Sequence, residues 1–85
     1  MTRDEILQEA AELINGDRQA AYGPAKANFQ RIADGWSVLL GVEVSPQQVA
    51  LCMTWLKMAR LVHQPGHKDS HVDAAAYIAL AAELA

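Results

Sequence analysis

The chain has 85 residues and a formal net charge of −3, which is enough length for one domain, residues 1–85, and no more. Apolar residues make up 52% of it and charged residues 20%, so a disordered tail is excluded, and the acidic balance argues against nucleic-acid binding. One cysteine excludes a disulfide framework, and the sequence predicts neither a membrane helix nor a signal peptide. We therefore expect a cytoplasmic protein with no membrane partner.

The first helix is predicted to begin at the capping box Thr2-Arg3-Asp4-Glu5, whose two end side chains each bond to a free backbone N–H. Apolar residues recur at helical spacing as far as Ile14, and Gly16 ends the helix. Glu9 and Glu12 lie one turn apart, a spacing with which two carboxylates can share a Mg²⁺ ion. A solvated acidic face is the alternative interpretation of this pair.

The segment from Asp17 to Gly23 has no helical or strand period and is predicted to form an ordered loop. Arg18 in this loop can bind a phosphate through two parallel hydrogen bonds, and Tyr22 offers an aromatic face to a nucleotide base. The alternative is a loop held on the core by Tyr22, with Arg18 in solvent.

A second helix is predicted from Pro24, at its first position, to Leu40, where Gly41 closes it. The capping box Ser45-Pro46-Gln47-Gln48 starts a third helix, which runs to about Leu61 or Val62 and is apolar nearly all round. Such a helix must be surrounded on most sides. The side chains expected in the core include Phe29, Trp36, Cys52, Trp55 and the methionines.

The break at Gln64-Pro65-Gly66 ends the third helix, and the next helix is predicted with Ser70 as N-cap, Asp73 as its acidic partner and an end near Leu84. Together these elements predict an all-α, compact four-helix domain in which the third and fourth helices form a buried antiparallel hairpin. Two such apolar helices are difficult to cover within 85 residues. We therefore expect a homo-oligomer.

A cluster of charges is predicted where this hairpin reverses. Lys57 and Arg60 lie in the last turns of the third helix, and Asp69, Asp73 and Tyr77 share one stripe of the fourth. One interpretation is a structural ion pair from Lys57 or Arg60 to Asp73. The other is a phosphate site, because the start of the fourth helix offers free N–H groups to an anion, with further ligands on its approach from His67, Lys68 and Ser70.

Five motifs together resemble a family of small phage and prophage proteins, namely G-D-R-x-x-x-Y-G-P (16–24), F-x-x-I-A-x-x-W (29–36), V-x-P-x-x-V-A (44–50), K-x-A-R (57–60) and H-x-D-S-x-V-D-x-A-x-Y (67–77). That family is distantly similar to the MazG-like nucleoside triphosphate pyrophosphatases. The similarity implies an all-α oligomer that binds Mg²⁺ and nucleotide between helices. It also implies an E-x-x-E pair, matched by Glu9 and Glu12, and an E-x-x-D pair, from which Asp69 and Asp73 depart because Ser70 holds the first acidic position.

The resulting prediction is a phage-type protein that binds a phosphorylated nucleotide at a site between helices or subunits, and hydrolysis by a MazG-like mechanism stays open. The alternatives are a non-catalytic anti-defence protein that sequesters a nucleotide second messenger in the host cytoplasm, and a protein-binding inhibitor of a host factor. The candidate ligand-binding residues are Arg18, Tyr22, Lys57, Arg60, His67, Lys68, Ser70 and Tyr77. The candidate Mg²⁺ ligands are Glu9, Glu12, Asp69 and Asp73.

Overall fold

The computed structural model describes residues 1–16, 20–21 and 23–85. Within these residues the chain contains no β-strand, so the prediction of an all-α domain is confirmed. The helices are α1 (Arg3–Asn15), α3 (Ala25–Leu40), α4 (Pro46–His63) and α5 (Lys68–Glu83).

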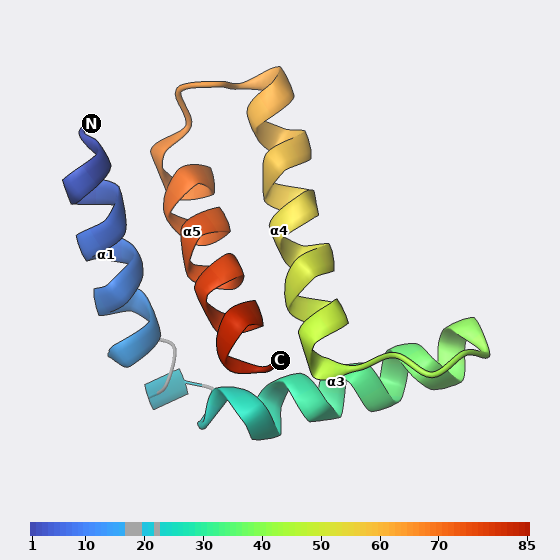
Figure 1. Cartoon of the computed structure of the whole chain (residues 1–85). Coiled ribbons are helices and arrows are strands. Elements are labelled where there is room, and N and C mark those ends of the chain that lie inside the picture. The colour runs from blue at the N-terminus through green and yellow to red at the C-terminus, as the bar shows by residue number, and fades with distance from the viewer. Residues whose placement is uncertain (17–19, 22) are drawn as a thin grey trace.

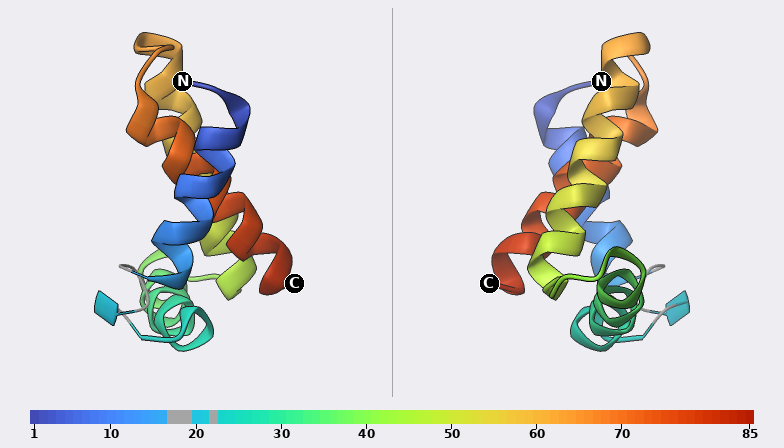
Figure 2. Two further views of the ribbon diagram at one scale, coloured as in Figure 1. Left: turned by 90° about the vertical axis from the view of Figure 1, so that its left-hand side faces the viewer. Right: turned by 90° about the vertical axis from the view of Figure 1, so that its right-hand side faces the viewer.

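Helix α5 lies between α1 and α4, and the three run side by side (Figure 1). Helices α4 and α5 make the most extensive contact, as predicted for an antiparallel hairpin closed by a short Pro-Gly connection. Helix α3 crosses the lower ends of the other three, and its C-terminal half projects beyond α4 (Figures 1 and 2). The radius of gyration is 13.3 Å, against about 12 Å for a typical folded chain of this length. The projecting helix explains this excess.

The helix ends follow local capping chemistry. The Thr2 hydroxyl accepts a hydrogen bond from Glu5 N at 3.2 Å, and the predicted capping box at Ser45 is present in both directions. Helix α5 differs from the prediction, because its N-cap is His67, and Ser70 is the third residue of the helix. The ring Nδ1 of His67 accepts a hydrogen bond from the Ser70 backbone N–H at 3.3 Å. His67 thus caps the helix, a role that Ser, Thr, Asp or Asn usually fills.

Two clusters of buried side chains hold the helices together. The larger one joins α3, α4 and α5 around Phe29, Val49 and Leu80, and Phe29 is buried as predicted. The smaller one joins α1 to α5 through Ala10, Val72 and Ala76. Because α5 lies in the middle, it contributes to both clusters, and alanines on its surface allow its neighbours to approach closely.

One face of α4 is not covered by the residues of this chain that the structure describes. Trp55 is 70% exposed and Val62 is 85% exposed, and Cys52 is exposed as well. The expectation that Trp55 and Cys52 lie in the core is therefore wrong for a single chain. The reason is that α5 and α3 contact the opposite face of α4. In the part of the chain that the structure describes, no helix is long and apolar enough to cross a membrane.

Candidate functional site

The charges predicted at the hairpin reversal form an ion pair across α4 and α5. Lys57 Nζ lies 3.0 Å from Asp73 Oδ2, with side-chain exposures of 16% and 31%. The sequence allowed two interpretations of these charges, a structural ion pair and a phosphate site. The structure contains the ion pair. Arg60 is exposed on the same helix. The ammonium of Lys57 is thus neutralised by a carboxylate of its own chain.

The groups at the start of α5 are also engaged with one another. Ser70 is fully buried, and its hydroxyl lies 2.7 Å from the His67 Nδ1 that caps the helix. His71 Nε2 donates to the carbonyl of Pro65 at 2.8 Å. Because the N-cap is filled and the Ser70 hydroxyl is out of solvent, a phosphate at this helix end would have to displace existing hydrogen bonds.

Lys68 binds a carboxylate of α1. Its Nζ lies 2.9 Å from Glu9 Oε2, with both side chains partly exposed. The hydrogen bond with Glu9 and the charge of that carboxylate raise the pKa of Lys68 above its usual value, and the charges of Glu5 and Asp69 add to the effect. The ion pair ties the first turn of α5 to α1, so two predicted site residues, one cation and one carboxylate, satisfy each other.

The four predicted Mg²⁺ ligands do not come together within one chain. Glu9 pairs with Lys68, Glu12 accepts a hydrogen bond from Gln8, and Asp73 pairs with Lys57. Among the residues that the structure describes, no group of three or more His, Cys, Asp or Glu side chains is placed to hold a metal ion. The reason is that Glu9 and Asp73 face different neighbours on the two sides of α5.

Tyr77 packs against the core. Its ring meets that of Phe29 edge to face, with the centroids 6.4 Å apart and the planes at 86°. The remaining two predicted ligands, Arg18 and Tyr22, lie outside the described residues.

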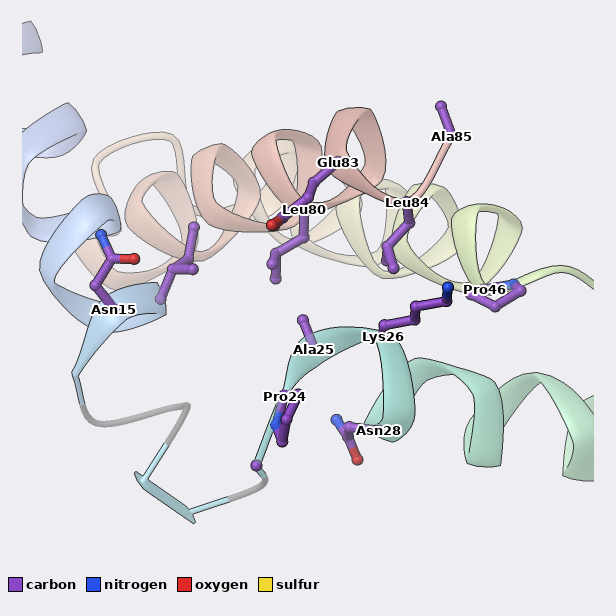
Figure 3. A pocket seen from close by; sticks show the side chains of 12 residues that line it. Asn15, Pro24, Ala25, Lys26, Asn28, Pro46, Leu80, Glu83, Leu84 and Ala85 are labelled. Carbon is purple, nitrogen blue, oxygen red and sulfur yellow. The ribbon is translucent and has the colours of Figure 1, made fainter.

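A cavity that sequence reasoning missed lies at the other end of the molecule, between the end of α1 and the start of α3 (Figure 3). Its volume is about 460 Å³, within the range of small-molecule sites. Leu80 and Leu84 of α5 face Ala25 and Lys26 of α3 across it (Figure 3). The lining is mainly apolar, and its polar side chains are Asn15, Lys26, Asn28 and Glu83.

The start of α3 makes this cavity electropositive on one wall. Pro24, which was predicted as the first helical residue, is the N-cap, and among the residues that the structure describes no side chain caps the free N–H groups. The first turn contains no acidic residue but does contain Lys26. A helix N-terminus with this arrangement favours an anion. The opposite wall carries Glu83 from the end of α5. In the sequence, Pro24 and Lys26 indicate a helix start that favours an anion. The cavity itself arises because α3 crosses the end of α5, and this crossing could not be predicted from the sequence.

Comparison with known proteins gives a family. A family model described as a domain of unknown function, DUF6378, matches residues 5–85. The Gene 55 protein of Mycobacterium phage L5 is 47% identical over 73 residues, and the Gene 55 protein of Mycobacterium phage D29 is 40% identical over 74 residues. These matches cover 85% and 87% of this chain but 47% and 49% of the relatives, so the chain spans about half their length. No solved structure matches. The chain belongs to the DUF6378 family, and the predicted resemblance to phage proteins of unassigned function is confirmed.

Proposed function

We propose that this chain is a phage-encoded binding protein for a phosphorylated nucleotide, acting in the host cytoplasm, with the cavity between α1, α3 and α5 as its site. The observation that carries the proposal is a mainly apolar cavity of nucleotide-compatible volume, with Lys26 on one wall beside a helix N-terminus that no described side chain caps. The phosphate would bind Lys26 and the free N–H groups of α3, because both favour negative charge. The base would contact Leu84, and Glu83 could accept a hydrogen bond from a ribose hydroxyl or an amino group.

The hairpin reversal supports this proposal less well than the cavity does. Lys57, His67 and Ser70 are already engaged within the chain, whereas Arg60 is exposed. Arg18 and Tyr22 lie outside the described residues, and they stay sequence-based candidates for ligands of the phosphate and the base.

Non-catalytic sequestration is the form of this function that the observations favour. MazG-like hydrolysis, which the distant similarity implies, needs about four carboxylates around Mg²⁺ on a pyrophosphate. Glu9 and Asp73 each pair with a lysine of the same chain, and no three His, Cys, Asp or Glu side chains gather among the described residues, which argues against such a Mg²⁺ site. The protein-binding inhibitor is the second candidate, because α4 exposes a large apolar face that a host protein could cover.

Isothermal titration with a panel of mono-, di- and cyclic nucleotides, with and without Mg²⁺, tests the proposal. Lys26→Met should weaken binding about 10-fold or more, because a charge-assisted hydrogen bond is lost. Arg60→Met is the matched control, since it removes an exposed cation at a distance from the cavity, and it should leave the affinity unchanged. Loss of affinity in Arg60→Met but not in Lys26→Met would move the site to the hairpin reversal, and an equal loss in both would contradict the cavity as the site. No binding to any nucleotide would contradict the proposal, and product formation that Asp73→Asn abolishes would support hydrolysis instead.

A further inference from the structure

The exposed face of α4 has the pattern of a helix that pairs with another helix. Leu51, Trp55, Met58 and Val62 are all exposed, and they follow one another at spacings of four, three and four residues. This is the spacing of the contact stripe of a coiled coil. We call these four residues the α4 stripe.

On α4 itself, the exposed residues beside the α4 stripe carry no charge. Its exposed neighbours on the same face are Gln48, Cys52 and Ala59. The two strongly basic residues of α4 lie elsewhere, with Lys57 turned to Asp73 of α5. A helix face that meets water normally carries charged residues, so this face has the composition of an interface core, which is poor in charge and rich in Trp and Met.

We propose that the α4 stripe is the surface through which two copies of this chain form a two-fold symmetric dimer with antiparallel α4 helices. The spacings of the stripe are the same when counted from either end of the helix. In an antiparallel pair of α4 helices, Leu51 of each copy therefore lies opposite Val62 of the other. Trp55 of each copy lies opposite Met58 of the other. A two-fold interface must be complementary to itself in this way. Because the stripe has no charge, neither copy repels the other there.

The area is adequate for a dimer. Two such stripes, each made of four large side chains that are between two-fifths and nine-tenths exposed, bury on the order of 1,000 Å² in total, which is about the lower bound of a specific interface. The C-terminal half of α3 projects beyond α4 (Figure 2), and it exposes two further apolar residues, Val38 and Leu39. The inference does not rest on the proposed function, because the cavity lies at the opposite end of α3.

Sedimentation velocity over a series from about 1 to about 100 µM tests the dimer. The expected mass is twice 9.2 kDa, and Trp55→Glu should raise the dissociation constant about 100-fold, as for a central aromatic hot spot. Leu7→Glu is the matched control, since Leu7 is a comparably exposed apolar residue on α1. Circular dichroism should show that both variants are folded. A monomeric protein throughout the series, or equal behaviour of the two variants, would overturn the proposal.

Thiol cross-linking tests the antiparallel arrangement. In a Cys52→Ser background, chains with Leu51→Cys should cross-link to chains with Val62→Cys when the two are mixed, and neither should cross-link to itself. Efficient linking of Leu51→Cys chains to one another would indicate parallel helices and overturn the proposed geometry.

Discussion

Single residues at the hairpin reversal show how charge is accommodated beside an apolar helix. The Lys57 ammonium, which is largely covered, is 3.0 Å from Asp73 and has no need of an external anion. This pair could be predicted from the sequence, because helical spacing and a short connection fix which turns of two helices meet. The role of His67 could not, because histidine is not among the preferred N-cap residues and its capping depends on the conformation of the loop before α5.

Removal of Asp73 should cost more stability than removal of the whole ion pair. Asp73→Ala leaves the Lys57 ammonium half-buried and unpaired, and we expect a loss of about 1–2 kcal/mol in the free energy of unfolding. The double variant Lys57→Met with Asp73→Leu places apolar groups of similar size on both helices and should recover most of that loss. Urea denaturation of Lys57→Met, Asp73→Leu and the double variant, together with Asp73→Ala, measures this coupling. Additive losses would show that the two side chains do not interact.

At the level of elements, the helices were predictable because their ends carry local signals. Capping residues and glycines set the bounds of α1, α3 and α4 to within a residue or two. The exposure of α4 was not predictable, because an apolar composition indicates that a surface is to be covered but not which chain covers it. The cavity was not predictable either, since its walls are the ends of α1, α3 and α5 together with Pro46, and the crossing angle of α3 is not encoded in any single segment.

Alanine substitution of a glycine inside α3 and of the glycine at its C-cap should change the stability of the fold in opposite directions. Gly35 lies inside the helix with open space where a Cβ would be, so Gly35→Ala should stabilise the fold by about 0.5–1 kcal/mol. Gly41 is the C-cap with φ of 70°, so Gly41→Ala should destabilise it by about 1 kcal/mol. Neither added Cβ has another atom within 4 Å. The difference in stability between the two variants therefore reports on backbone conformation and not on side-chain packing. Thermal unfolding followed by circular dichroism at 222 nm, the usual wavelength for helices, measures both, and changes of the same sign would contradict the assignment.

For the whole molecule, the size of the buried core limits stability. Among the residues that the structure describes, five of the nine buried hydrophobic residues are alanines, and Phe29, Val49 and Leu80 are the largest fully buried apolar side chains. Alanine permits close helix packing but removes little apolar area from water. A chain of this length has roughly 4–13 kcal/mol of stability to begin with. We therefore expect the stability of an isolated copy to lie at the low end of this range. Burial of the α4 stripe in a dimer would add the apolar burial that the monomer core lacks.

The melting temperature should consequently depend on protein concentration. Binding between folded copies stabilises the folded state by mass action, and a 100-fold rise in concentration above the dissociation constant should raise the melting temperature on the order of 5 °C. Trp55→Glu should remove this dependence, because its chains stay monomeric, whereas Leu7→Glu should retain it. Differential scanning calorimetry of the three proteins at matched concentrations measures the effect. If the wild-type chain has the same melting temperature at both ends of the concentration series, the fold is stable without a second copy.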